Sequence, residues 1–422
     1  MAQLTNDCFA FSGPLLPIDA MQRLIVERVA PVAGEETVSL LLAHGRVLAR
    51  DLVASIDLPP FANSAVDGYA VRHDDLAAAG ETRLRVAERV AAGQAAAAPL
   101  AGGQAIRIFT GAPMPQDADT VFMQEDCRVE DGAVIVPAGL KRGANARTAG
   151  EDIARGAVAL AAGTRIGHAQ IALAAALGQT GVAVRRAVRV ALFSTGDELV
   201  APGQPLAAAR IYDSNRYLLA SMLRSFAAEV TDLGILPDDP KALAAALKDA
   251  AGRHDLILTS GGVSTGEADH VRGAVEAIGT LVFWRVAIKP GRPVAMGVIP
   301  AAGGSAAFVG LPGNPVAVFV TFARVVRPLL LRLSGAAAEP PLAYPVRAGF
   351  AYKKKLGRRE YVRVALRREV DGTLTAAKHP REGAGVISSL TETDGLAELG
   401  EDVTAVAPGD TIGFIPYAAL VG

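Results

Sequence analysis

The stretch that decides the fold is DLILTSGGVSTGEAD, residues 255–269. It opens with a short apolar run, Asp255–Thr259, which has the length and composition of a buried strand. A serine and two glycines follow, and paired glycines let a backbone turn sharply and approach a ligand. Asp269 then stands near the start of the next apolar segment. We therefore expect a strand, a glycine-rich turn and a helix here.

The same alternation of strand and helix extends upstream of this segment. We expect strands at Arg189–Phe193 and Glu229–Ile235, a helix that begins near Asp213 or Ser214, and a second helix at Pro240–Ala251. Alternation of this kind predicts a doubly wound, largely parallel sheet. The ligand site of such a sheet lies at the carboxyl ends of its strands.

The remainder of the 422 residues predicts further domains. Apolar residues at helical spacing predict a helix from Ile18, and the apolar run Leu40–Leu48 predicts another. Short β-branched runs between Pro, Gly and Asp then indicate a small β-domain. We expect a multidomain α/β plus β protein: a discontinuous N-terminal helical and linker domain (18–51 with 143–182), a β-domain (52–142), the doubly wound domain (183–335) and a small, barrel-like C-terminal β-domain (336–422).

Composition excludes several classes of function. With 42 basic and 43 acidic side chains, the net charge of -1 argues against a nucleic-acid or anionic-membrane partner. Cys8 and Cys127 are too far apart in sequence for a disulfide framework or a zinc motif. The N-terminus lacks the pattern of a signal peptide, and no apolar run is long enough to span a membrane. We expect a soluble, cytoplasmic protein.

Polar segments follow the expected strands and indicate a ligand site. The glycine-rich loop at 260–266 could be an ordinary turn or a cradle for a phosphate or pterin. STGDEL (194–199) and PDDP (237–240) could likewise be turns or helix caps. Because these strand ends share one edge of the sheet, five carboxylates could converge there and hold Mg²⁺ with ligand phosphates: Asp197, Glu198, Asp238, Asp239 and Asp269.

Two loops rich in proline and glycine offer an oxyanion pocket. They are KPGRP (289–293) and LPGNP (311–315), and Lys289 and Arg292 supply cationic donors. The alternative is a pair of structural turns with solvated basic side chains. Asp67, in the loop PPFANSAVDGYA (59–70), could be a ligand-binding carboxylate or a turn former, and spacing does not decide between them.

These segments, in this order, resemble the bacterial molybdopterin molybdenumtransferase (MoeA) family and its plant and animal homologues. The resemblance extends over most of the chain. It is carried by nine motifs: PPFANSAVDGYAV, TGAPMP, GANARTAGEDI, STGDEL, YDSNR, LPDDP, SGGVSTGEAD, FWRVAIKPGRP and LPGNPVA.

The resemblance implies an enzyme of molybdenum cofactor assembly. Members of the family are elongated homodimers of four-domain chains, with a site between the doubly wound domain of one subunit and N-terminal elements of the other. Molybdate enters the dithiolene of adenylylated molybdopterin and AMP is released, with Mg²⁺ present. A transient contact with the molybdopterin adenylyltransferase is also expected.

Site residues are carried over by motif. The resemblance implies catalytic roles for Asp67, Thr110, Asp152, Glu198, Lys289 and Arg292. Asp238 and Asp269 would hold Mg²⁺. Contacts to the pterin, its phosphates or molybdate are implied for a larger set: Ser194, Thr195, Gly196, Asp197, Ser260, Gly261, Gly262, Ser264, Gly266, Pro290, Gly291, Pro312, Gly313, Asn314, Arg363 and Ser388.

Three positions depart from the family pattern and leave alternatives open. Ala62 replaces a frequent acidic residue, Arg285 a frequent lysine, and Ala317 a serine linked to molybdate binding. The loss of that hydroxyl favours, as an alternative, a paralogue that binds the cofactor without inserting metal. An adenylyltransferase is usually a small single-domain protein, which argues against that activity. The sequence also lacks the long linker or fused enzyme of the animal relative that acts as a scaffold.

Overall fold

The computed structural model describes residues 15–32, 34–261, 270–291, 293–337 and 340–421. The chain divides into two compact units. The larger unit comprises residues 1–50, 163–167 and 183–422, and the smaller unit comprises residues 51–162 and 168–182. Each unit has its own sheets and its own hydrophobic core.

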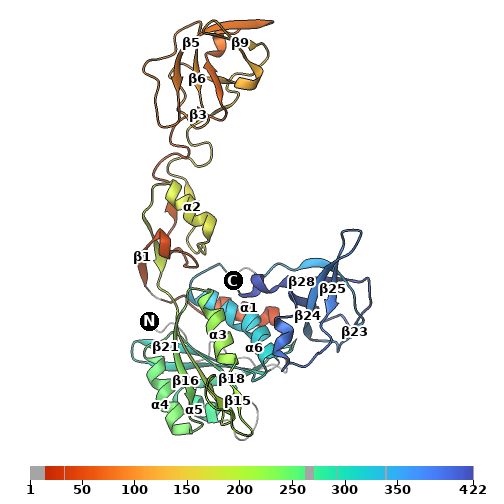
Figure 1. The fold of residues 1–422 in the computed structure, drawn as a ribbon. Coiled ribbons are helices and arrows are strands. Elements are labelled where there is room, and N and C mark those ends of the chain that lie inside the picture. Colours follow the sequence, from red (N-terminus) through yellow and green to blue (C-terminus); the bar gives the residue numbers. More distant parts are fainter. Residues whose placement is uncertain (1–14, 33, 262–269, 292, 338–339, 422) are drawn as a thin grey trace. The chain divides into compact units, whose positions relative to one another are not determined.

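The smaller unit is built around a six-stranded sheet of order β7-β4-β6-β5-β9-β8 (Figure 1). Val71 and Leu84 belong to the core on one face, and Ala70 and Ile108 to the core on the other. Two-stranded ribbons, β2 with β11 and β3 with β10, and helix α2 complete the unit. The bounds are β2 Leu52–Val53, β3 Asn63–Ser64, β4 Gly68–Val71, β5 Glu81–Val90, β6 Gln104–Ile108, β7 Thr120–Met123, β8 Arg128–Glu130, β9 Ala133–Pro137, β10 Ala146–Arg147, β11 Val158–Leu160 and α2 His168–Ala176.

The larger unit contains the doubly wound sheet, of order β16-β13-β17-β21-β20-β18. The first four strands are parallel, and β20 and β18 continue the sheet in antiparallel fashion. The bounds are β13 Arg189–Thr195, β16 Glu229–Leu236, β17 Leu256–Ser260, β18 Thr280–Arg285, β20 Pro293–Ala301 and β21 Gly304–Leu311. The covering helices are α1 Ile18–Arg28, α3 Asn215–Arg224, α4 Pro240–Ala251, α5 His270–Ile278, α6 Pro315–Thr321 and α7 Arg327–Leu333.

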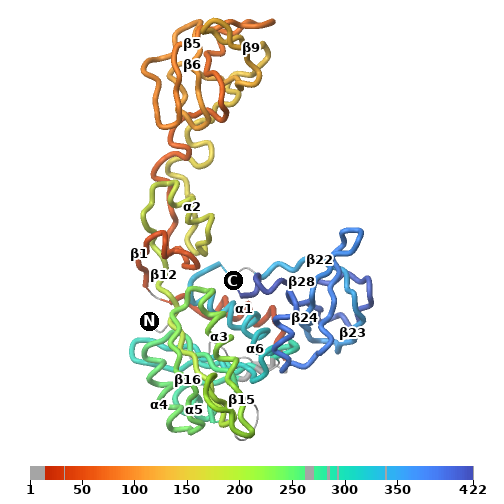
Figure 2. The backbone as a smooth tube through the Cα atoms, in the orientation of Figure 1, coloured from red at the N-terminus to blue at the C-terminus, as the bar shows by residue number. Residues whose placement is uncertain are grey.

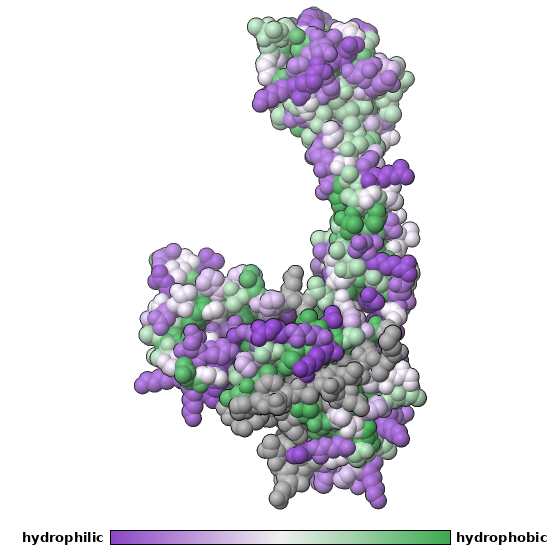
Figure 3. Space-filling view, turned by 180° about the vertical axis from the view of Figure 1, so that it is seen from behind, coloured by the Kyte–Doolittle hydropathy of each residue, from purple (hydrophilic) through white to green (hydrophobic). Residues whose placement is uncertain are grey.

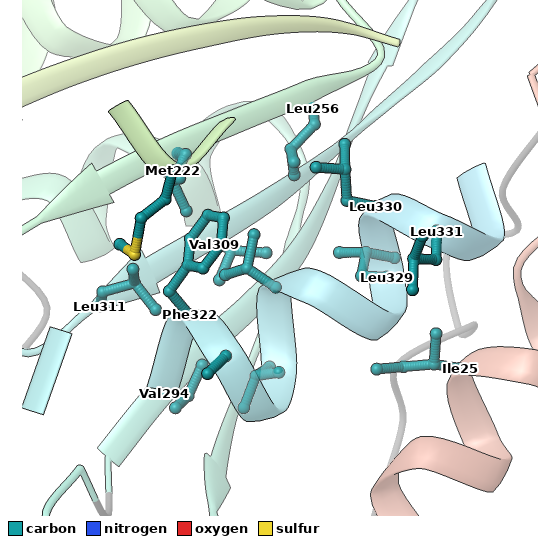
Figure 4. Close-up of a cluster of buried hydrophobic side chains, with 14 of the residues drawn as sticks. Ile25, Met222, Leu256, Val294, Val309, Leu311, Phe322, Leu329, Leu330 and Leu331 are labelled. Atoms are coloured by element: carbon teal, nitrogen blue, oxygen red, sulfur yellow. The ribbon is translucent and has the colours of Figure 1, made fainter. Parts of the chain in front are cut away.

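Both faces of this sheet are buried because side chains alternate along each strand. On β13, Val190 and Leu192 join one core, whereas Ala191 and Phe193 join the other. The first core includes side chains of α1, α3, α6 and α7, and the second includes side chains of α4 and α5. In Figure 4, Met222 lies near Leu311, and Phe322 lies near Val309, in the first core. The sheet is therefore doubly wound, as predicted.

A π-helical turn, Phe322–Val326, joins α6 to α7. Pro328 in the first turn of α7 has no N–H, so the carbonyl of Arg324 loses its ordinary helical donor. Gln22 of α1 donates to that carbonyl from its side-chain amide at 3.2 Å. Figures 1 and 2 show α1, from the start of the chain, among these late helices.

The C-terminal strands close a small barrel, in the ring β24-β25-β22-β28-β26-β24. The short strand β19, Ile288–Lys289, pairs in parallel with β24 and so joins this barrel. The bounds are β22 Tyr344–Ala348, β23 Tyr352–Lys353, β24 Arg359–Arg368, β25 Leu374–Lys378, β26 Gly395–Leu399, β27 Ala405–Val406, β28 Thr411–Pro416 and α8 Tyr417–Val421. The remaining strands are β1 Glu35–Ser39, β12 Gly181–Arg185, β14 Leu199–Val200 and β15 Ile211–Tyr212.

One expected helix is wrong. After α1 the chain forms β1 and then a 3₁₀ turn, Leu40–Leu42, instead of a helix over Leu40–Leu48. Gly45 has a φ of 77°, a left-handed conformation that does not continue an α-helix. Leu41 and Leu42 are exposed, so the apolar run does not form a buried helical face. The division into four domains with the expected boundaries stays a prediction.

In the part of the chain that the structure describes, no helix is long and apolar enough to cross a membrane. On the face shown in Figure 3, hydrophilic and hydrophobic residues are interspersed.

Candidate functional site

A cavity of about 310 Å³ lies at the carboxyl edge of the doubly wound sheet. Its walls come from the ends of β13 and β17, the turn before α3, the loop before α6, and a C-terminal loop. It is called the first cavity below. Six residues that the sequence predicted line it: Thr195, Glu198, Ser260, Gly261, Gly313 and Asn314.

Strand register brings three of these walls together. Ser260 on β17 pairs with Ser194 on β13 and with Leu311 on β21, so the three strands end side by side. Gly261 turns the chain away with a φ of 84° and donates its N–H to the Leu311 carbonyl at 3.1 Å. A glycine suits this position because other residues are strained at such a φ.

The carboxylate of Glu198 folds back over Gly196. A Cβ built on Gly196 would lie 2.7 Å from Glu198 Oε2, and the φ of Gly196 is 142°. The positive φ favours a glycine at this position, and a Cβ there would also require the exposed Glu198 carboxylate to move. Asp197, between these two residues, is exposed and does not line the first cavity.

Two lining residues carry buried oxygens that have no partner among the described residues. They are Thr195 Oγ1 and Asn215 Oδ1. Thr195 is 3% exposed, and Asn215 uses its Nδ2 to donate to the Gly313 carbonyl at 2.6 Å. A buried polar atom without a partner costs free energy and calls for an explanation. Both residues line the first cavity, which makes it the candidate place for the missing partners.

A buried ion pair supports the wall beside Asn215. Asp213, 2% exposed, accepts from Arg216 Nε at 2.9 Å, and Arg216 also bonds Asp232 at 2.5 Å. Although burial acts to raise it, the pKa of Asp232 is lowered because Arg216 and the Gly234 N–H donate to the carboxylate. The start of α3 is thereby held in place.

A second cavity, of about 180 Å³, lies between β19 and the C-terminal barrel. The predicted residues Lys289, Pro290 and Arg363 line it. Lys289 Nζ bonds Glu360 Oε2 at 3.2 Å and the Tyr352 hydroxyl at 3.1 Å. Burial acts to lower the pKa of Lys289, but the hydrogen bonds to Tyr352 and Glu360 outweigh burial and raise it. The side chain therefore remains a cation.

Arg363 uses two of its side-chain nitrogens to donate hydrogen bonds to the neighbouring loop. Its two terminal nitrogens donate to the carbonyls of Gly383 at 3.0 Å and Arg381 at 2.8 Å. Burial lowers the pKa of its guanidinium. The loop it holds contributes Ala384 to the second cavity and Gly385 to the first, so one loop forms part of both walls.

The remaining predicted residues near these cavities have supporting positions. Gly291 packs on α6, where a Cβ would lie 2.4 Å from Thr321 Cγ2 and 3.4 Å from the Ala317 carbonyl. Ser194 is buried in the sheet, Pro312 precedes α6, and Ser388 lies on a 3₁₀ turn, Ile387–Leu390. None of these four lines either cavity.

In the smaller unit, Asp67 and Thr110 come together. Asp67 Oδ1 accepts from the Thr110 backbone N–H and from its hydroxyl, both at 2.8 Å. These two hydrogen bonds lower the pKa of Asp67. Asp152 is an exposed residue of another loop, and its backbone N–H donates to the Leu58 carbonyl at 2.9 Å.

The predicted metal site is only partly described. Asp238 is partly buried beyond the end of β16, and Asp239 caps α4 by accepting from the Ala242 N–H at 2.7 Å. Within the described ranges, no group of three or more acidic, histidine or cysteine side chains could hold a metal ion. The other predicted residues lie outside these ranges: Gly262, Ser264, Gly266, Asp269 and Arg292.

Sequence reasoning missed several residues that line the cavities. Asn215 belongs to the YDSNR motif, and its place at the start of a helix on the ligand edge of the sheet was an available signal. Tyr352, Glu360 and Lys378 come from the barrel, far along the chain from Lys289, and no local pattern links them.

Family comparisons cover nearly the whole chain. Residues 16–178 match the MoeA N-terminal region (domain I and II), and residues 191–332 match a probable molybdopterin binding domain. Residues 345–417 match the MoeA C-terminal region (domain IV).

Individual relatives agree with these matches. A molybdopterin molybdenumtransferase of Haemophilus influenzae is 35% identical, covering 97% of this chain and 100% of the relative. One from Nostoc sp. is 37% identical, covering 92% and 90% respectively. The crystal structure of the molybdopterin biosynthesis moeA protein from Pyrococcus horikoshii OT3 superposes with a TM-score of 0.79 at 29% identity, covering 96% of this chain and 100% of that chain.

Proposed function

Because the chain belongs to the molybdopterin molybdenumtransferase (MoeA) family, we propose that it inserts molybdate into adenylylated molybdopterin and releases AMP. The observation that carries this proposal is the first cavity, where the family's motifs meet around Thr195 and Asn215, whose buried oxygens have no partner among the described residues. A pterin nucleotide has the N–H and O–H donors that such oxygens require.

The two cavities support different parts of the reaction. The first cavity, with its strand-end turn at Gly261 and the carboxylate of Glu198, suits the pterin and its phosphates. The second cavity, with the cations Lys289 and Arg363, suits the molybdate oxyanion and the charge of the departing phosphate. Arg292 would add a further cation, and Asp67, Thr110 and Asp152 are proposed as contributions of the N-terminal half.

Mg²⁺ is proposed as the divalent cation. Asp238 lies at the ligand edge of the same sheet as the first cavity, and carboxylate oxygens are ligands that Mg²⁺ prefers. Asp238 and Asp269 would hold it, and it would neutralise charge on the substrate phosphates.

We also propose a cytoplasmic homodimer. Leu41 and Leu42 on the turn after β1 are 93% and 73% exposed, and adjacent leucines this exposed are typical of a contact surface. A transient contact with the adenylyltransferase that supplies the substrate completes the set of partners.

Insertion measured with purified components tests the proposed function. With adenylylated molybdopterin, Mg²⁺ and molybdate, the protein should release AMP and yield a molybdenum-loaded pterin, and Asp269→Asn should abolish both while the protein stays folded. A parallel reaction with tungstate measures oxyanion preference. Full activity of Asp269→Asn would contradict the assignment of Asp269 to the site. Binding of adenylylated molybdopterin without AMP release would identify a paralogue that has lost insertion.

A further inference from the structure

The wall of the second cavity contains a buried carboxylate directly beside Lys289. Lys289 on β19 and Glu360 on β24 are partners in the parallel strand register, so their side chains lie next to each other. Glu360 is 1% exposed, whereas the Lys289 side chain is 45% exposed. The carboxylate is thus a fixed internal group, and the ammonium faces the cavity.

Three donors satisfy this carboxylate. Oε2 accepts from the Tyr352 hydroxyl at 2.7 Å and from Lys289 at 3.2 Å, and Oε1 accepts from Arg358 at 2.6 Å. A buried carboxylate is stable only when it is paired and hydrogen-bonded in this way. With its oxygens committed, Glu360 is poorly placed to contact a substrate itself, so any role in the reaction goes through its partners.

The direction of these bonds orients the ammonium. The Tyr352 hydroxyl gives its hydrogen to Glu360, which leaves its oxygen free to accept from Lys289 at 3.1 Å. An ammonium group has three N–H donors. Two are directed to Tyr352 and Glu360, and the third is left for a ligand in the cavity.

We propose that Glu360 and Tyr352 are positioning residues, which hold the Lys289 ammonium at the wall of the second cavity so that its third N–H meets the molybdate oxyanion. This inference rests on the proposed function, in which Lys289 contacts molybdate. The other cations of the cavity have ion-pair or hydrogen-bond partners of their own, since Lys378 pairs with Glu382 and Arg363 donates to the loop carbonyls. Lys378 Nζ also lies 5.8 Å from the centre of the Tyr352 ring, a contact that Tyr352→Phe keeps.

Direct binding of molybdate to the intact protein, by equilibrium dialysis, tests the inference. Tyr352→Phe should weaken binding about tenfold, because one constraint on the ammonium is lost. The matched control is Tyr361→Phe, at another tyrosine that lines the cavity, whose hydroxyl bonds Glu398 at 3.0 Å and not Lys289. The control should bind molybdate within about twofold of the unmodified protein.

A double-mutant cycle separates positioning from a structural effect. In a Lys289→Met background, Tyr352→Phe should change molybdate binding by less than about twofold, because its effect passes through Lys289. The same tenfold loss in both backgrounds, or an equal loss in Tyr361→Phe, would overturn the positioning role. If Lys289→Met itself binds molybdate normally, the proposed function of Lys289 fails, and the inference fails with it.

Glu360→Gln supplies a second readout, in the pH profile of molybdate binding. Seven other ionisable side chains line the second cavity with Lys289: Tyr352, Glu360, Tyr361, Arg363, Lys378, His379 and Glu382. Arg358 also pairs with Glu360. Removing the carboxylate charge lowers the pKa of Lys289, so the alkaline loss of binding should move to lower pH. A structural defect alone would weaken binding evenly across pH, and that result would contradict the inference. Thermal unfolding of each variant confirms that it is folded.

Discussion

At the scale of single residues, Thr195 connects stability with ligand binding. The residue lines the first cavity at the end of β13, and its hydroxyl oxygen is buried and has no partner among the described residues. Such an atom lowers the stability of the free protein and gains a hydrogen bond when a ligand enters. The free energy of unfolding that is lost in the free protein is therefore regained when a ligand binds.

Thr195→Val should therefore have opposite effects on stability and binding. The free energy of unfolding of the free protein should stay the same or rise by about 1 kcal/mol, and affinity for molybdopterin nucleotide should fall about tenfold. Chemical denaturation and a binding titration measure the two quantities. Thr259→Val is the control, because Thr259 Oγ1 is also buried without a described partner but lies away from the cavity. If Thr259→Val also weakens binding, the assignment of Thr195 to the binding site is contradicted.

The sequence predicted where strand-end residues lie in the sheet better than it predicted which side chains they contact. Thr195, Ser260 and Gly261 lie at one edge of the sheet and line the first cavity, because parallel strands bring their carboxyl ends to one edge whatever the details of packing. Glu360 and Tyr352 could not be placed, since their approach to Lys289 depends on β19 pairing with the barrel. Two residues of β19 carry no periodic signal of their own.

At the scale of elements, the run from α6 to α7 shows how a hydrogen bond missing from a helix is replaced by a side chain from elsewhere in the chain. Pro328 interrupts the hydrogen-bond ladder, and the π-turn Phe322–Val326 absorbs the interruption. The Gln22 amide then donates to the Arg324 carbonyl. Figure 4 shows Leu329 and Leu330 of this run in the first core.

Gln22→Leu should lower the free energy of unfolding by about 1–2 kcal/mol, because the Arg324 carbonyl loses the Gln22 side-chain donor. Gln22→Glu should cost at least as much, since a carboxylate keeps the shape but cannot donate. Urea denaturation gives both values. Glu27→Gln, an exposed change on the same helix, should stay within about 0.5 kcal/mol. Equal stability of all three variants would show that this contact contributes nothing.

Strands and helices of the doubly wound sheet follow from the sequence because each has a clear period and a polar boundary. Helix α4 begins and ends where expected, at Pro240 and Ala251, with Asp239 as its cap. The run Leu40–Leu48 misled because apolar residues normally indicate burial, whereas Leu41 and Leu42 face outward. The spacing of apolar residues in a sequence cannot distinguish a buried face from an exposed one.

At the scale of the whole molecule, folding draws together segments that are far apart in sequence. Arg359 of the barrel bonds Asp19 of α1 at 2.9 Å, and β19 leaves the doubly wound domain to extend the barrel sheet. The second cavity exists only because of this joining, since Lys289 and Arg363 line it from the two sides. The architecture could be predicted from the sequence, but the joining depends on tertiary packing that no local pattern encodes.

The exposed leucines give a prediction for the assembled protein. Leu41→Ser combined with Leu42→Ser should convert the proposed dimer to monomer in sedimentation experiments, because the contact surface loses its apolar side chains. Insertion activity should fall with the dimer, since the family resemblance implies a site shared between subunits. Leu342→Ser with Leu356→Ser, a pair 66% and 69% exposed, is the control and should leave both properties intact. If the Leu41 and Leu42 variant remains a dimer with full activity, the subunit contact lies elsewhere.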